Sequence, residues 1–90
     1  MKKPTESEMV DWVLEQFKNA PPKHQEEFKN REIRDLIMYH STLGQAIRNH
    51  FKLWETKWKP EIDVGGVDYS PDHPDAISHR VIEAAWRKLQ

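Results

Sequence analysis

Two groups of polar side chains in the second half of the sequence are of types that can do chemistry. The first is an oxygen-rich segment containing Glu61, Asp63, Asp68, Asp72, His73 and Asp75. Carboxylate oxygens are the ligands that Ca²⁺ and Mg²⁺ prefer. The spacing differs from that of an EF-hand, whose ligands alternate within about twelve residues around a glycine. We therefore interpret the segment as a solvated acidic loop, and we expect neither a metal nor a cofactor.

The second group mixes basic and aromatic side chains. Arg48, Lys52, Lys57 and Lys59 alternate with His50, Phe51, Trp54 and Trp58. Proteins that bind single-stranded nucleic acid use this combination, because cations pair with phosphates and rings stack on bases. The alternative is that Phe51 and Trp54 are core residues and that the lysines solubilise a helix end. We favour this alternative, except for Trp58, which lies beyond the helical pattern and can anchor an interface.

Catalytic motifs are absent from the sequence. The five histidines show no HExxH or paired-ligand spacing, so zinc catalysis is not expected. There is no Gly-rich phosphate loop and no GxSxG turn. The absence of cysteine removes disulfide frameworks, thiolate zinc sites and cysteine nucleophiles. We therefore expect a protein that is not an enzyme.

Amphipathic helical patterns position these side chains. Helices are predicted at residues 5–19, 22–29, 31–53 and 73–89, and the third is either one bent helix or two abutting helices broken near residue 41. Thr5 and Glu8 have the spacing of a capping box, which indicates the start of the first helix. Asp72 or His73 caps the last helix, with Pro74 at its first position. Gly44 lies inside the third pattern and indicates close packing rather than a weak point.

Residues 55–73 lose helical periodicity and form one long irregular loop containing Pro60, Gly65, Gly66 and Pro71. Such long loops in small domains are usually functional or poorly ordered. Ile62, Val64, Val67 and Tyr69 flank the two glycines, so a very short hairpin is the alternative. We favour the irregular loop.

Length and composition favour a single all-α domain, a small bundle of about four helices. The chain has 90 residues, 37% apolar and 32% charged side chains, and a formal net charge of −1. The near-neutral charge argues against a general attraction to nucleic acid or anionic membrane. No apolar stretch is long enough for a signal peptide or a membrane span, so we expect a cytoplasmic protein. The predicted core is Trp12, Phe17, Leu36, Ile47, Phe51, Val81 and Trp86.

Two blocks of the sequence resemble a family of small uncharacterised bacterial and bacteriophage proteins, a domain of unknown function. The pattern is LGxxIRNxxxLW followed, after a variable loop, by HPDxxS, and it covers roughly residues 32–89. The matching positions are Leu43, Gly44, Ile47, Arg48, Asn49, Leu53, Trp54, His73, Pro74, Asp75 and Ser78. The resemblance implies a shared helical fold and no chemistry. We expect Arg48 to brace the loop by pairing with Asp75 or with loop carbonyls, because its planar fork suits that role.

The functional interpretation is a non-catalytic protein-interaction domain whose target is unknown. Its contact surface is predicted to contain Trp58, Lys59, Ile62, Asp63, Asp68 and Tyr69. If the chain is phage-encoded, as the resemblance implies, it modulates a host protein. The alternative is a nucleic-acid-binding module that uses Arg48, Lys52, Lys57 and Lys59. The sequence leaves the oligomeric state open.

Overall fold

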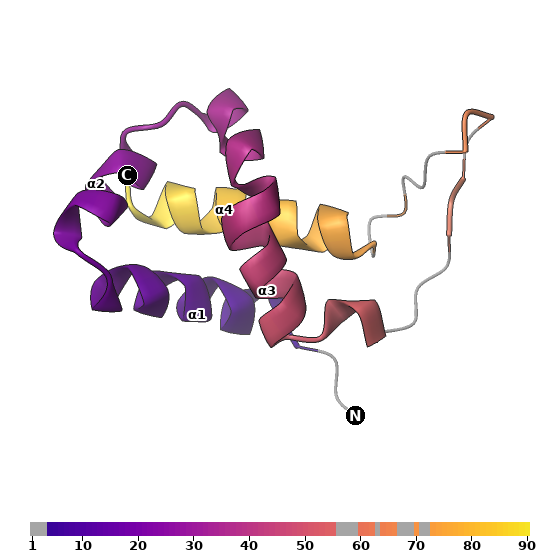
Figure 1. Ribbon diagram of the computed structural model, residues 1–90, viewed down its shortest axis with the longest axis horizontal. Helices are drawn as coiled ribbons and strands as arrows, with labels where there is room; N and C mark the ends of the chain where they lie inside the picture. The colour runs from indigo at the N-terminus through magenta and orange to yellow at the C-terminus, as the bar shows by residue number, and fades with distance from the viewer. Residues whose placement is uncertain (1–3, 56–59, 63, 67–69, 71–72) are drawn as a thin grey trace.

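The computed structural model describes residues 4–55, 60–62, 64–66, 70 and 73–90, and within these residues the protein is all-α (Figure 1). The predicted small all-α fold is confirmed. In chain order the elements are α1 (Glu6–Asn19), α2 (Pro22–Lys29), the 3₁₀-helix η1 (Ile33–Tyr39), the π-helix η2 (His40–Gly44), α3 (Gln45–His50), the 3₁₀ turn η3 (Leu53–Glu55) and α4 (Pro74–Lys88). Ile62 makes an isolated β-bridge. Val67 and Tyr69 of the hairpin alternative lie outside the described residues.

The ends of α1, α2 and α4 agree with the sequence prediction. The Oγ1 atom of Thr5 accepts a hydrogen bond of 3.1 Å from the Glu8 amide and caps α1. α1 ends before Pro21, because a proline excludes the α conformation from the preceding residue, and Pro22 opens α2. His73 caps α4, with Pro74 at its first position. Local chemistry therefore determines these three helices.

The predicted helix at 31–53 is wrong in detail, because the segment changes its helical type twice. It begins as a 3₁₀-helix, continues from His40 as a π-helix and becomes α-helical only from Gln45. The change at His40 lies next to the predicted break near residue 41. α3 ends at His50, and Lys52 turns the chain with a φ of 53°, in the left-handed region. The last apolar positions of the pattern thus fall in a turn and in η3.

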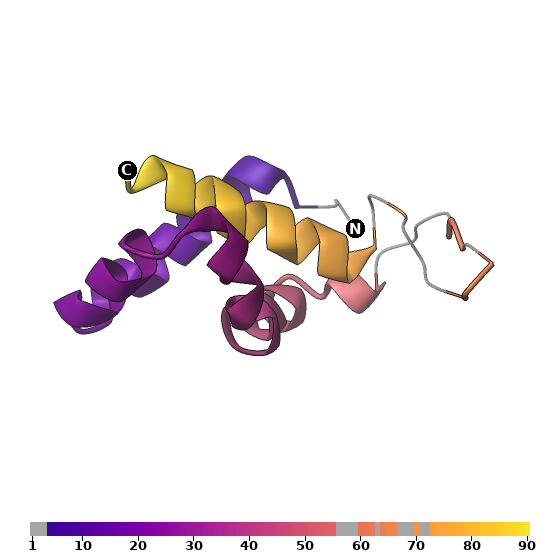
Figure 2. The same ribbon diagram turned by 90° about the horizontal axis from the view of Figure 1, so that it is seen from above.

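α1 and α4 lie side by side and run in the same direction, and the segment from η1 to α3 crosses α4 (Figures 1 and 2). α4 contacts α1, η1, η2 and α3. The C-terminal end of α4 lies next to α2 (Figure 1). At the other end of α4, the described residues 60–62 and 64–66 lie away from the helices (Figure 1). α4 is therefore the element around which the rest of the domain packs.

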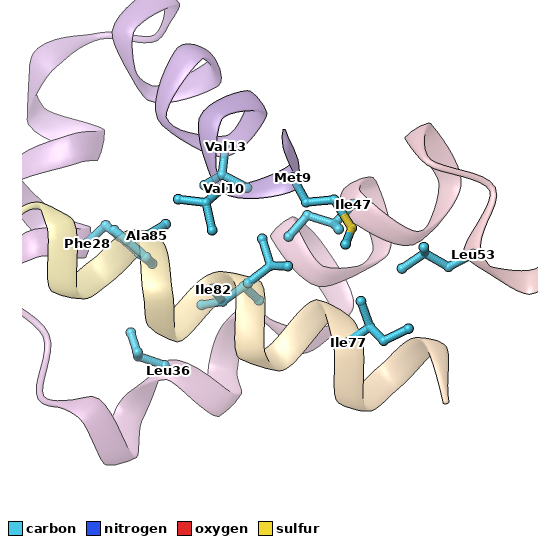
Figure 3. Packing of buried hydrophobic residues seen from close by; sticks show 11 residues of the cluster. Met9, Val10, Val13, Phe28, Leu36, Ile47, Leu53, Ile77, Ile82 and Ala85 are labelled. Carbon is cyan, nitrogen blue, oxygen red and sulfur yellow. The ribbon is translucent and has the colours of Figure 1, made fainter. Parts of the chain in front are cut away.

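The core lies between α1, α4 and the crossing segment (Figure 3). It consists of Met9, Val10, Val13, Phe28, Leu36, Ile47, Leu53, Ile77, Val81, Ile82 and Ala85. Leu36, Ile47 and Val81 were predicted and are fully buried. Phe28, which the predicted core did not include, is also fully buried. α2 therefore contributes one aromatic ring that fixes it to the domain.

The four large aromatic residues predicted for the core are only half-buried, which corrects that prediction. Trp12, Phe17, Phe51 and Trp86 pack against the edge of the core. The molecule measures 41 × 31 × 18 Å, and its shortest dimension is less than two helix diameters of about 10–12 Å. So thin a domain encloses aliphatic side chains more easily than large rings. The rings instead form clusters at the rim, as Trp12 does with His50 and Phe51.

Candidate functional site

The best-defined polar cluster surrounds the guanidinium of Arg48, which α3 carries between η2 and α4. The side chain is 7% exposed. Its Nη1 donates a hydrogen bond of 3.0 Å to Ser78 Oγ, and its Nη2 donates one of 3.0 Å to the carbonyl oxygen of His40. Its Nε lies 3.6 Å from Asp75 Oδ1. The predicted pairing of Arg48 with Asp75 is confirmed, and one guanidinium fork joins three elements.

Gly44 makes room for this guanidinium. A Cβ atom at Gly44 would lie 3.0 Å from Arg48 Nη1 and 3.3 Å from the carbonyl oxygen of Tyr39. It would also lie 3.6 Å from Cδ1 of Ile82 on α4. The predicted close packing at Gly44 is therefore present, with the Arg48 side chain as the nearest neighbour. Because Gly44 and Arg48 are four residues apart, a continuous helical turn places them on one face.

The first turn of α4 supplies the other half of the cluster. Ser78 is 1% exposed, and its hydroxyl donates to the carbonyl oxygen of Asp75 at 3.0 Å while it accepts from Arg48. His73 Nδ1 accepts the amide N–H of Asp75 at 3.0 Å. The rings of His73 and Trp54 meet edge to face, with centroids 5.6 Å apart. The two blocks of sequence that carry the family resemblance therefore meet at the buried Arg48.

The motif residues outside this cluster have mixed environments. Ile47, Leu53 and Pro74 are buried, Leu43 is half-buried and Asn49 is exposed. Trp54 is 52% exposed, which corrects its assignment to the core. The buried residue is Leu53, the preceding position, because the turn at Lys52 displaces the helical register.

Most of the predicted contact surface lies outside the residues that the structure describes. This applies to Trp58, Lys59, Asp63, Asp68 and Tyr69. Of the predicted contact residues, the structure describes Ile62, which is 63% exposed. Val64 nearby is fully exposed, beside Gly65 and Gly66. The described part of the loop thus presents two aliphatic side chains to solvent.

The basic and aromatic block is not the surface that the nucleic-acid alternative expected. Arg48 is buried and bound within the fold, so it cannot reach a phosphate group. Lys52 is exposed, and His50 stacks on Trp12 with ring centroids 4.4 Å apart. Lys57 and Lys59 fall outside the described ranges. The inclusion of Arg48 among the phosphate-binding residues is therefore wrong.

A recess of about 350 Å³ lies at the other end of the molecule, and sequence reasoning did not detect it. It is lined mainly by apolar side chains from α1, η1, η2 and α3, namely Phe17, Tyr39, Leu43 and Ala46. α2 contributes the polar side chains of His24 and Glu27. Phe28 stacks on Phe17 and meets Tyr39 edge to face. Tyr39 and Leu43 of its lining lie on either side of the change from 3₁₀-helix to π-helix, which the apolar periodicity does not reveal.

Metal-binding groups and membrane-spanning helices were sought among the described residues. Among these residues, no three His, Asp or Glu side chains form a group that could hold a metal ion. None of the described helices is long and apolar enough to cross a membrane. Every buried side-chain nitrogen or oxygen in the described ranges has a hydrogen-bond partner. The buried polar groups are thus satisfied by one another.

The fold and the Arg48 cluster define a small helical domain braced by a buried guanidinium. Residues 13–89 match the domain of unknown function DUF6794, so the chain belongs to this family. The match begins well before residue 32, where the resemblance seen in the sequence started, and it includes α2 and the second half of α1. No curated protein and no solved structure matches the chain.

Proposed function

We propose that this chain is a non-catalytic protein-interaction domain that binds its target through the loop between η3 and α4. The observation that carries the proposal is the exposure of apolar side chains on the described loop residues 60–62 and 64–66, which lie away from the helices (Figure 1). Ile62 and Val64 are exposed on the loop, and Trp54 is half-exposed at its base. Exposed apolar patches and exposed tryptophans are typical of binding surfaces.

The Arg48 cluster supports a binding role over a catalytic one. Its Ser, His and Asp residues are of catalytic types, but the buried Ser78 hydroxyl donates to a backbone carbonyl and accepts from Arg48. A nucleophile needs a base within hydrogen-bond reach and access to substrate. The cluster is better suited to hold the start of α4, and with it one end of the binding loop, in a fixed position.

More specifically, we propose that the target is a host protein. This part of the proposal rests only on the resemblance to bacteriophage proteins. The acidic residues of the loop, Asp63 and Asp68 among them, would select a target with a basic surface. Cytoplasmic location is part of the same proposal.

The test compares capture of a partner from host lysate by the wild type and by a triple variant, Trp58→Ala with Asp63→Lys and Asp68→Lys. We expect the variant to keep its helicity and melting temperature and to lose the captured protein. A matched control, Glu15→Lys with Glu26→Lys, changes charge on exposed positions of α1 and α2 and should retain the partner. If the triple variant retains the same partner at undiminished affinity, the loop is only a connector. The recess lined by Phe17 and Tyr39 is then the next surface to test.

Nucleic-acid binding is the competing class, and the same experiment separates it. Lysate treated with nuclease should yield the same partner if the target is a protein. Binding to nucleic acid would weaken steeply with added salt, since each phosphate contact releases counterions. An apolar protein interface would change little. The burial of Arg48 removes one of the four cations on which this alternative relied.

A further inference from the structure

The recess between α2 and the crossing segment has the size and the lining of a small-ligand site. Its volume is about 350 Å³. Ligand sites in proteins are hollows of about 300–1,000 Å³ with mostly apolar walls and a few polar groups that orient the ligand. Side chains from α1, α2, η1, η2 and α3 line this recess. Because five elements form it together, its shape is a property of the fold and not of one loop.

Aromatic rings form the apolar wall of the recess. Phe17 and Tyr39 line it, and both contact the fully buried ring of Phe28 behind them. Phe17 stacks on Phe28 with ring centroids 4.7 Å apart, and Tyr39 meets it edge to face at 5.1 Å. A ring fixed in a closely packed core restricts the rings that pack on it. Leu43 and Ala46 add aliphatic groups, so the wall offers a preformed apolar surface to a ligand.

The polar groups of the recess include one carboxylate. His24 and Glu27 are three residues apart on α2, so the helix carries them on one side, and both are exposed. Thr42 adds a hydroxyl group that donates to the carbonyl oxygen of Tyr39 at 3.5 Å. Among the described residues that line the recess there is no lysine or arginine. Glu27 forms no ion pair with any other described residue, so its carboxylate is available to a positively charged ligand.

We propose that the recess binds a small organic ammonium ion, a ligand with an apolar body and a protonated amine. The body packs against Phe17, Tyr39 and Leu43, and the ammonium group lies at the Glu27 carboxylate. The aromatic wall also favours a cation, since the face of an aromatic ring attracts positive charge. The lining residues all lie outside the loop between η3 and α4, so this site is separate from the surface proposed for the protein target.

The experiment titrates the protein with three probes that share a phenyl ring and differ in charge: 2-phenylethylammonium, 2-phenylethanol and 3-phenylpropionate. NMR shifts of the Leu43 and Ala46 methyl groups report binding at about pH 8, the upper end of the interval in which histidines change charge. We expect dissociation constants in the millimolar range for ligands of this size. The amine should bind about three- to fivefold more tightly than the alcohol, and the carboxylate most weakly. The charge effect is modest because Glu27 is exposed and Lys23 lies four residues before it on α2.

Substitutions with matched controls test the charge and the position of the site separately. Glu27→Lys should reverse the order of the probes, so that the carboxylate binds more tightly than the amine. Glu26→Lys makes the same change of charge at the neighbouring exposed position, which does not line this recess, and should keep the wild-type order. Ala46→Phe places a ring in the recess and should abolish binding of all three probes, whereas Gln45→Phe, at the exposed position before it, should not.

The comparison of the three probes on the wild type needs no variant and holds even if a substituted chain fails to fold. Equal affinity of the wild type for the amine and the carboxylate would overturn the proposal. So would the wild-type order of the probes in Glu27→Lys, or undiminished binding to a folded Ala46→Phe.

Discussion

Arg48 contributes to the fold through the geometry of its donors. Its five N–H groups lie in one plane and point in fixed directions, so a single side chain can serve a carbonyl on η2, a hydroxyl on α4 and a carboxylate on α4. The carbonyl of His40 lies at the start of the π-helix, where the regular helical hydrogen-bond pattern changes. The guanidinium therefore satisfies a backbone group where the helix changes type, and it also attaches that segment to α4.

Replacing Arg48 should destabilise the protein more than any surface charge does. Arg48→Ala leaves the buried Ser78 hydroxyl without its donor and the His40 carbonyl without its side-chain partner, so we expect a loss of about 2–3 kcal/mol in the free energy of unfolding. In a domain of this size the melting temperature should fall by roughly 10–20 °C. The measurement is thermal and urea unfolding followed by circular dichroism.

Two further variants test whether the fork, rather than the charge, is responsible. Arg48→Lys keeps the charge but cannot reach all three partners, so its stability should fall between wild type and Arg48→Ala. Arg87→Ala removes an exposed arginine that lies 3.7 Å from Glu83 and should change stability by less than about 0.5 kcal/mol. An Arg48→Ala variant with wild-type stability and no partner binding would instead place Arg48 in an interface.

At the scale of elements, the helical type of η1 determines which of its side chains are buried. A 3₁₀-helix has about three residues per turn, so positions three apart share a face. Ile33, Leu36 and Tyr39 follow this spacing; Leu36 is fully buried, Tyr39 is half-buried and Ile33, at the start of η1, is 40% exposed. Ile37 falls off that face and is 63% exposed, although an α-helical period would have buried it with Leu36. Leu36 and Ile37 are therefore neighbours in sequence with opposite environments.

The two neighbouring positions should therefore respond differently to substitution. Leu36→Ala removes a fully buried side chain and should cost about 2–5 kcal/mol. Ile37→Ser replaces an exposed side chain and should change stability by no more than about 0.5 kcal/mol. Chemical denaturation of both variants gives the comparison. If Ile37→Ser were as damaging as Leu36→Ala, residues 33–39 would form an α-helix with both side chains inside the core.

At the scale of the molecule, a helix could be predicted from the sequence when the contacts that determine it lie within a few residues of it along the chain. α1, α2 and α4 were predicted closely because their caps and prolines act within a few residues. The geometry of residues 33–44 was not predicted, because it accompanies a contact with Arg48 and contacts with α4, which lies far along the chain. The pairing of Arg48 with Asp75 was predicted from residue types. The hydrogen bonds that Arg48 donates to the Ser78 hydroxyl and to the His40 carbonyl were not predicted. Every residue has a backbone carbonyl, so the sequence does not indicate which one a side chain will bind.

The large aromatic residues also show what the sequence pattern does not reveal. Periodicity indicates which side of a helix faces inward, but it does not indicate how deep the interior is. Trp12, Phe17, Phe51 and Trp86 do face the core, and the thinness of the domain leaves them at its rim. Trp86 also has a polar contact there. Its Nε1 donates a hydrogen bond of 2.9 Å to the carbonyl oxygen of Arg31, 55 residues earlier in the chain.

This bond holds the C-terminal end of α4 against the connection between α2 and η1, and its removal gives a prediction for the whole molecule. Trp86→Phe keeps a ring against the core but has no N–H group, so we expect a loss of about 1 kcal/mol, with a melting temperature lower by roughly 4–8 °C. Trp86→Ala also removes the ring and should cost more, about 2–3 kcal/mol for a half-buried side chain. Because α4 contacts α1, η1, η2 and α3, helix content and the fluorescence of the remaining tryptophans should still be lost in one cooperative transition. If Trp86→Phe unfolded at the same urea concentration as the wild type, the contact with Arg31 would contribute nothing to closure of the domain, and ring packing alone would hold that end of α4.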